Sequence, residues 1–151
     1  MSDYDSRPDT REHIAKVQEF LEEVIGSLHY RAAMHDQSKL VSPEVETFDE
    51  FTPKLRDTTY GSDEYKSYTA AMGEALKHHY AANSHHPEHY ASGIAGMSLL
   101  DLIEMLCDWK AATMRHNDGD IRRSVGINRD RFQISEQLEH VLLNTIDEMA
   151  W

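Results

Sequence analysis

The sequence is poor in cysteine, in long apolar runs and in positive charge, and each shortage excludes a class of protein. Its one cysteine, Cys107, cannot form a bridge within the chain, which excludes a small secreted scaffold held by disulfides. The longest apolar run, from Met97 to Leu106, is interrupted by Asp101 and Glu104 and is too short to cross a bilayer, which takes about 20 residues. The start of the chain does not read as a secretory leader. We therefore expect a cytoplasmic protein without a membrane span.

Positive charge is the third shortage. The chain has 27 acidic against 15 basic residues, a net charge of -12. A field of this sign repels a phosphate backbone, so we do not expect nucleic acid as a partner. The length of 151 residues fits one domain that buries about two-thirds of the surface of its unfolded chain. Neither a metal nor a disulfide is required for such a chain to fold.

Apolar residues recur at helical spacing, and this pattern predicts an all-α fold. Residues 1–9 lack the pattern and are expected to form a flexible arm before a domain over residues 10–151. Because of their caps and periodicity, we predict helices that begin near Thr10, Asp63, Ser98 and Ser135. We predict a short helix from Ser42-Pro43-Glu44 that ends before Pro53, and a long one from Asp63 to about Asn83. Gly26 is a point where the first helix could break. No stretch alternates as a strand, so the prediction is a compact single-domain bundle of five to seven helices.

Histidine is abundant, and its placement is uneven. Five of the ten histidines fall between residues 78 and 89, at the end of the predicted middle helix and just beyond it. One imidazole there complements the helix dipole, but five require another reason. Neutral imidazole binds zinc, iron, manganese, nickel and cobalt, so the cluster predicts a divalent metal.

Other candidate ligands lie on the inner faces or at the ends of the predicted helices. His13 shares a face with Val17, and His79 follows Leu76 on the middle helix. A single inward histidine is most often a core residue, but two on different helices favour a shared purpose. His35-Asp36 ends the first helical region, where the two side chains can converge on one cation. Asp108 is expected to be buried and therefore to need a partner. Asp101 and Glu104 are assigned mainly to the solvent-exposed face of their helix.

Two resemblances follow from these residues. Their order, His…His-Asp…His…His…Asp, resembles the ligand order of the HD-domain metal-dependent phosphohydrolase superfamily, and His35-Asp36-Gln37-Ser38-Lys39 is similar to its His-Asp-x-x-Lys motif. From about His13 to Thr145 the chain is more closely similar to a family of small phage and bacterial proteins without an assigned activity. Its motifs are Asn-x-His-His-Pro-Glu-His, matched by Asn83 to His89, and Glu-Met-Leu-x-Asp-Trp, matched by Glu104 to Trp109.

The superfamily resemblance implies an HD-like fold that binds one or two divalent ions of manganese, iron, cobalt, nickel or zinc. The implied ligands are His13, His35, Asp36, His79, His85, His86 and Asp108. Asp36, which would bridge two ions, is a catalytic candidate with Lys39 and Glu88, and Glu104 is an alternative to Glu88. Lys39, Arg115 and Arg122 would neutralise substrate phosphate. The implied reaction is hydrolysis of a nucleotide or another small phosphate ester by a metal-activated water.

Several alternatives remain open at this point. His29 can replace His13, His78 can replace His79, and either His85 or His86 can be the ligand. The protein can instead be a non-catalytic, metal-stabilised module that binds a nucleotide or a protein, or a di-iron oxygenase of the same superfamily. Iron content with oxygen uptake, set against phosphate release with manganese, cobalt or nickel, separates the two enzymes. A homodimer is compatible with all three functions.

Overall fold

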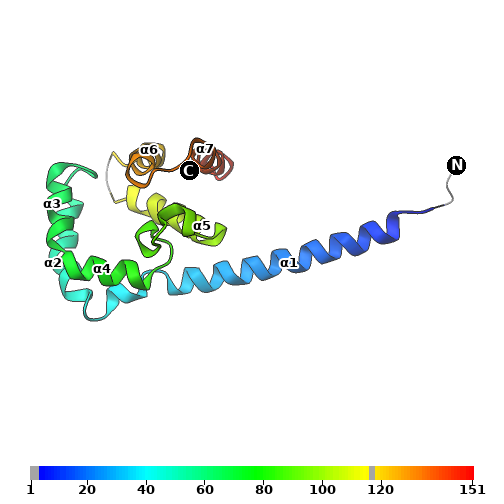
Figure 1. The fold of residues 1–151 in the computed structure, drawn as a ribbon, viewed down its shortest axis with the longest axis horizontal. Coiled ribbons are helices and arrows are strands. Elements are labelled where there is room, and N and C mark those ends of the chain that lie inside the picture. Colours follow the sequence, from blue (N-terminus) through cyan, green and yellow to red (C-terminus); the bar gives the residue numbers. More distant parts are fainter. Residues whose placement is uncertain (1–3, 116–117) are drawn as a thin grey trace. The chain divides into compact units, whose positions relative to one another are not determined.

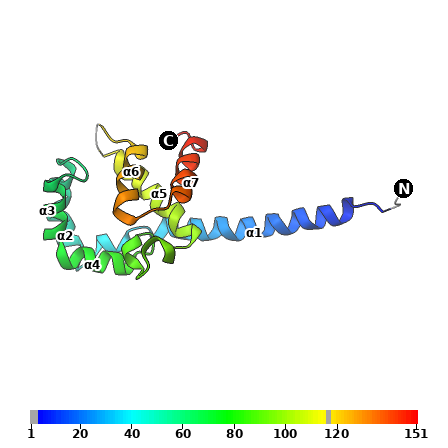
Figure 2. The ribbon, with the colours of Figure 1, turned by 45° about the horizontal axis from the view of Figure 1, so that its top comes forward.

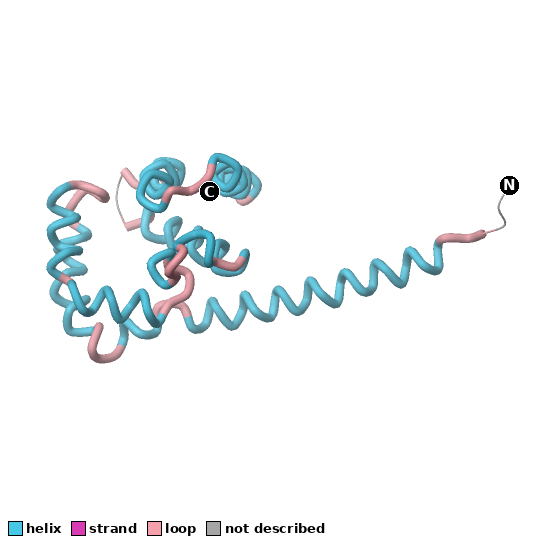
Figure 3. The backbone as a smooth tube through the Cα atoms, in the orientation of Figure 1, coloured by secondary structure: helices cyan, strands magenta, loops and turns pink. Residues whose placement is uncertain are grey.

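The computed structural model describes residues 4–115 and 118–151, and all the regular structure in these segments is helical (Figure 3). The predicted all-α class is therefore confirmed. The α-helices are α1 (Arg7–Met34), α2 (Val45–Arg56), α3 (Asp63–Ala71), α4 (Gly73–Ala82), α5 (Leu99–Thr113), α6 (Ile121–Phe132) and α7 (Glu136–Glu148). The 3-10 helices are η1 (Gln37–Leu40), η2 (Pro87–His89) and η3 (Gly93–Gly96). Within the described segments, no helix is both long and apolar enough to cross a membrane.

Contacts divide the chain into two units, Met1–His35 and Asp36–Trp151. The first unit consists mainly of α1, which runs through Gly26 without a break. All residues of α1 are described, and none is buried. Its apolar stripe, which includes Ile14, Val17 and Leu21, is exposed.

The second unit holds the other six α-helices. Its core lies where α5, α6 and α7 pack together (Figures 1 and 2). The buried residues of this core are Met105, Leu106, Trp109, Ile121, Val125, Ile134, Leu142 and Ile146. Another group of contacts joins α2 to α3 and η1, and joins α4 to α3, η1 and η2. The loops around α4 thereby come close to the turn that follows Asp36.

Three of the predicted helix starts are confirmed by their caps. The Ser62 hydroxyl accepts from the Tyr65 N–H, and the Ser135 hydroxyl accepts from the Leu138 N–H. Ser98 and Asp101 form the predicted capping box of α5. The first helix begins at Arg7, shortly before the predicted Thr10.

Other predicted boundaries are wrong. The helix predicted from Asp63 to Asn83 is two helices, because the chain turns at Gly73, whose φ of 40° lies in the left-handed region. Helix α2 begins at Val45, two residues after Pro43, and it continues through Pro53 to Arg56. The last turn of α2 still closes, since the Asp57 N–H donates to the Pro53 carbonyl at 3.3 Å.

Helix α6 was not predicted. Its buried face carries polar Ser124 and Asn128 as well as apolar Ile121 and Val125, so its apolar periodicity is weak. The start of α6 is fixed by Asp120, whose carboxylate accepts from the N–H groups of Arg122 and Arg123.

Candidate metal centre

Asp36 is the first residue of the second unit and has an uncommon backbone conformation. Its φ of 55° lies in the left-handed region, which aspartate tolerates better than most residues. The η1 turn that follows is closed by the Lys39 N–H, which donates to the Asp36 carbonyl at 2.9 Å. This turn brings the Lys39 ammonium within 2.6 Å of Asp36 Oδ2. The other carboxylate oxygen, Oδ1, faces the histidines.

Those histidines come from the end of α4 and the loop after it. The Asn83 amide donates to the His79 carbonyl at 2.8 Å and ends α4, so that His85 and His86 turn back toward His79. His79 Nε2 and His85 Nε2 lie 3.5 and 3.4 Å from Asp36 Oδ1. His86 Nε2 lies 2.9 Å from His79 Nε2. Four donor residues thus converge on one point.

The spacing of these donors fits a divalent ion. The donor atoms of Asp36, His79, His85 and His86 all lie within 4.8 Å of one another. Metal–ligand bonds of about 2.1 Å in tetrahedral or octahedral geometry place neighbouring donors about 3.0–3.4 Å apart. The measured separations of 2.9, 3.4 and 3.5 Å lie close to this range. Three imidazoles and a carboxylate are also ligand types that suit zinc, iron, manganese, cobalt and nickel.

A buried glutamate that the sequence did not indicate holds one side of the centre. Glu44, just before α2, has no exposed surface, and its Oε2 lies 3.0 Å from His79 Nδ1. An ionised carboxylate accepts, so it favours the His79 tautomer with the proton on Nδ1 and a lone pair on Nε2, which faces Asp36. The Ser38 hydroxyl donates to the same Oε2 at 3.0 Å, and His78 Nδ1 lies 2.6 Å from Oε1. No local pattern in the sequence marks Glu44, because its histidine partners lie on a different helix.

A second glutamate acts on His85 in the same way. Glu104, on α5, has its Oε1 at 3.0 Å from His85 Nδ1, which leaves His85 Nε2 toward the centre. Asp108 lies one turn further along α5, with its Oδ2 at 3.9 Å from His85 Nε2. From the sequence, Glu104 was expected on the solvent-exposed face of its helix and Asp108 was expected to be buried. The carboxylate of Glu104 is the less exposed of the two, at 13% against 26% for Asp108.

The surroundings favour the neutral form of two imidazoles, those of His79 and His86. Burial, together with the neighbouring His85 and His79, lowers the pKa of His86 to about 3. Burial and the Lys39 ammonium also lower the pKa of His79, against the opposing effect of the Asp36 and Glu44 carboxylates. A neutral imidazole is the form that binds a metal.

Asp101 anchors the helix that carries Glu104 and Asp108. Its buried carboxylate accepts from the Ser98 N–H and from the hydroxyls of Ser98, Ser84 and Tyr90, each at 2.8 Å. Burial opposes ionisation of Asp101, but these hydrogen bonds hold its pKa well below the usual range. Asp101 therefore has a structural role, and the Ser84 contact fixes the histidine loop to α5.

The remaining predicted residues lie elsewhere or belong to the other unit. His13 is exposed on α1 and His35 caps the end of α1, both in the first unit, so their part in a metal site remains a prediction. His78 is exposed, whereas His79 is buried. Arg115 is exposed beyond the end of α5. Arg122, on α6, pairs with Asp147, and Glu88, on η2, pairs with Arg131 at 2.7 Å.

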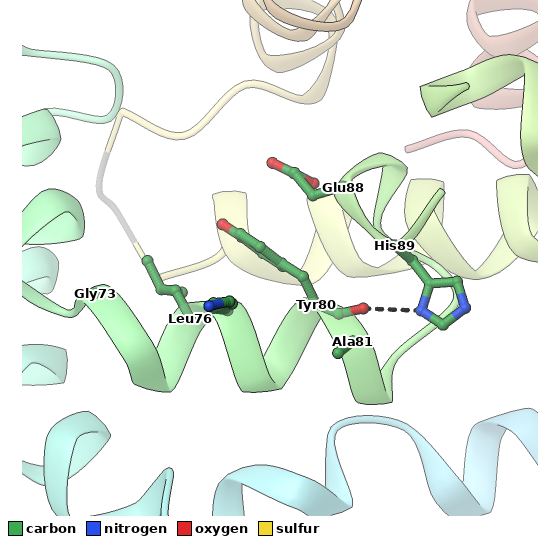
Figure 4. A pocket seen from close by; sticks show the side chains of 7 residues that line it. Gly73, Leu76, Tyr80, Ala81, Glu88 and His89 are labelled. Carbon is green, nitrogen blue, oxygen red and sulfur yellow. Dashed lines mark hydrogen bonds between the residues drawn. The ribbon is translucent and has the colours of Figure 1, made fainter. Parts of the chain in front are cut away.

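A hollow of about 410 Å³ lies between α4 and η2. Its lining consists of Gly73, Leu76, Lys77, Tyr80, Ala81, Glu88 and His89. Figure 4 shows the Tyr80 and Glu88 side chains pointing to the same side of α4, and His89 Nδ1 donating to the Tyr80 carbonyl at 2.9 Å. None of the four donor residues lines the hollow, but the ring of Tyr80 lies 5.1 Å from that of His86. Tyr80 therefore stands between the metal centre and the hollow.

Comparison with known proteins identifies a family for this chain, and the function of that family is unknown. Residues 2–148 match the family of unknown function DUF5662. No curated protein and no solved structure matches the chain. The match spans nearly the whole sequence and both units, and the chain therefore belongs to the DUF5662 family.

Proposed function

We propose that the protein is a divalent-metal-dependent phosphohydrolase that acts on a nucleotide or another small phosphate ester. One observation carries the proposal: two glutamates, Glu44 and Glu104, orient His79 and His85 so that both Nε2 atoms face Asp36 Oδ1. Carboxylate–histidine pairs of this kind orient metal ligands and raise their basicity in metalloenzymes. The order of these residues along the chain, which resembles the HD superfamily, supports the same proposal.

Each residue has a role in this proposal. Asp36, His79, His85 and His86 would hold the ion, with Asp108 at the edge of the site. A bound divalent ion lowers the pKa of a coordinated water and polarises a phosphoryl oxygen. Lys39 fixes the second oxygen of Asp36 and offers a positive charge to an incoming phosphate.

The exposure of the two aspartates favours a reactive centre. The side chains of Asp36 and Asp108 are 17% and 26% exposed, whereas those of His79 and His85 are only 2% exposed. The centre therefore has a buried histidine side and a more exposed side formed by the two aspartates, although Asp36 Oδ1 itself is buried. Catalytic metal sites keep one such open position, while structural sites close it.

A second candidate is a metal-stabilised binding module without turnover. The number of donors favours it, since four protein ligands are enough to close a tetrahedral site. The two functions differ in phosphate release by metal-loaded protein. Release with manganese, cobalt, nickel or zinc supports the enzyme, and full metal occupancy without release supports the module.

The decisive variant is Asp36→Ala, with His140→Ala as its control. Asp36 faces two of the histidines, whereas His140 is exposed on α7. We expect Asp36→Ala to lose bound metal, measured by elemental analysis, and to lose phosphate release, while its far-ultraviolet circular dichroism stays helical. His140→Ala should change none of the three. Full metal occupancy in Asp36→Ala would show that the site is misplaced, and loss of helix would show that the ion is structural.

A further inference from the structure

An arginine from α6 pairs with Glu88, a residue that lines the hollow. Arg131 Nη2 lies 2.7 Å from Glu88 Oε1. Burial raises the pKa of the nearby Tyr80 hydroxyl, and Arg131 opposes this rise. Tyr80 comes from α4, Glu88 from η2 and Arg131 from α6. Three elements that are separate in the sequence thus meet at one polar cluster, here called the Arg131 cluster.

The aromatic ring of Tyr80 links this cluster to the metal centre. The Tyr80 ring lies 5.1 Å from the ring of His86 and 5.9 Å from the ring of His79. Arg131 acts electrostatically on the Tyr80 hydroxyl, which lies at the other end of that ring. A molecule that touches Arg131 and extends along Tyr80 is therefore directed toward the donors of the metal centre.

The guanidinium is accessible and retains binding capacity. The side chain of Arg131 is 46% exposed, and that of Glu88 is 27% exposed. A guanidinium has five N–H donors in a planar fork that matches the oxygens of a phosphate. The chain has a net charge of -12, which repels an anionic substrate. Such a substrate requires a fixed cation beside the site to overcome this repulsion.

The hollow beside the cluster suits the organic part of such a substrate. Tyr80 and Glu88 line it together with the apolar side chains of Leu76 and Ala81. Its volume of about 410 Å³ falls in the range of small-molecule sites, about 300–1,000 Å³. The Tyr80 ring offers a surface for a base or sugar ring, and the Glu88 carboxylate accepts hydrogen bonds from sugar hydroxyls.

We propose that Arg131 binds the phosphate of the substrate and that the hollow beside Tyr80 receives the nucleoside or sugar attached to it. The proposal rests on the proposed function and names the substrate side of the same site. In the free protein Glu88 neutralises Arg131, and an incoming phosphate competes with Glu88 for the guanidinium. Arg131 is thus a substrate-binding residue, and Glu88 tunes the strength of that binding.

Equilibrium binding tests this proposal without requiring turnover. Inorganic phosphate and adenosine monophosphate are titrated by calorimetry into the full chain, with manganese and without metal. We expect Arg131→Ala to weaken the binding of both ligands about tenfold, because a charge-assisted hydrogen-bond pair is lost. The matched control is Arg129→Ala, on the same helix, with 48% exposure and an ion pair to Glu139 at 3.0 Å, which should bind as the wild type does.

A Glu88→Gln variant separates binding from a purely structural ion pair. Removal of the competing carboxylate should tighten phosphate binding, whereas loss of a structural pair would weaken it in parallel with Arg131→Ala. The proposal is overturned if Glu88→Gln weakens binding, if Arg131→Ala binds like Arg129→Ala, or if the wild type binds neither ligand. Binding that depends on Arg131 in a protein that releases no phosphate would support this proposal and refute the phosphohydrolase.

Discussion

Glu44 contacts Ser38, His78 and His79, although no part of its side chain reaches solvent. We expect Glu44→Gln to weaken metal binding about 10–100-fold, the usual effect of losing a carboxylate behind a histidine ligand. The reason is that a neutral amide no longer fixes the proton on His79 Nδ1. Calorimetric titration with zinc measures the affinity. Glu46→Gln, an exposed acid in the first turn of α2, is the control, and equal affinities in the two variants would contradict the prediction.

Acid should destabilise the metal-free protein through His86. The pKa of His86 in the folded protein is about 3, below the value of about 6.5 for an unfolded chain. Between these two values the unfolded state binds the proton and the folded state does not, so the free energy of unfolding falls as the pH falls. The slope for this one group is about 1.4 kcal/mol per pH unit.

Urea unfolding at a series of pH values from 7 down to 5 measures this slope. These pH values cover about the upper half of the range between the two pKa values of His86. A His86→Asn variant lacks the titrating group, and its free energy of unfolding should depend less steeply on pH. His140→Asn, at an exposed position on α7, should keep the slope of the wild type. Equal slopes for His86→Asn and the wild type would refute the prediction.

At the scale of single residues, the sequence correctly predicts features that depend on the position of a residue around its helix. His79 was preferred over His78 from helix phase, and His79 is the buried one. Glu44 and Arg131 could not be predicted, because their contacts join helices whose packing no local pattern encodes. Glu104 was visible in the sequence, but its pairing with His85 depends on how the loop after α4 meets α5.

Among the elements, α5 has the most strongly fixed start. Asp101 accepts four hydrogen bonds there, and its side chain is buried. We expect Asp101→Asn to lower the free energy of unfolding by about 2–4 kcal/mol. The asparagine amide cannot accept all four hydrogen bonds, because its NH2 group is itself a donor and would face the other donors. The same change should weaken metal binding, since α5 carries Glu104. Urea unfolding measures the change in stability. The control variant, Asp130→Asn, changes an exposed residue on α6 and should leave the stability unchanged. A similar loss of stability in both variants would contradict the prediction.

Element starts could be predicted from the sequence more securely than element ends. Ser62, Ser98 and Ser135 cap their helices with hydroxyls that a local pattern reveals. The break at Gly73 and the continuation of α2 through Pro53 have no such cap to mark them, and helical periodicity alone did not reveal them. Helix α6 was missed because polar Ser124 and Asn128 occupy its buried face.

At the scale of the molecule, metal binding should stabilise one unit of the two. Asp36, His79, His85 and His86 all lie in the second unit. A ligand at 100 times its dissociation constant stabilises the state that binds it by about 2.7 kcal/mol, which raises the thermal midpoint by about 5–10 °C for a domain of this size. We therefore expect the unfolding of the second unit to move to higher temperature with saturating zinc.

Tryptophan fluorescence reports this shift selectively. Both tryptophans, Trp109 and Trp151, belong to the second unit, and Trp109 is part of its core. The fluorescence midpoint should rise with zinc in the wild type and stay constant in Asp36→Ala. A shift of the same size in Asp36→Ala would mean that the ion stabilises the protein from another place.

Three of the four donor residues, His79, His85 and His86, come from one short stretch of chain. Bringing such near neighbours together costs little loop entropy, and loops of about ten residues close in about 10–100 ns. An unfolded or growing chain can therefore gather three imidazoles around an ion before α5, α6 and α7 exist. An ion held in this way would act as a template to which the more distant Asp36 is drawn, and metal capture would then precede folding. If the unfolded chain also holds the ion, the stabilisation by zinc should stay below the limit for a ligand that binds only the native state.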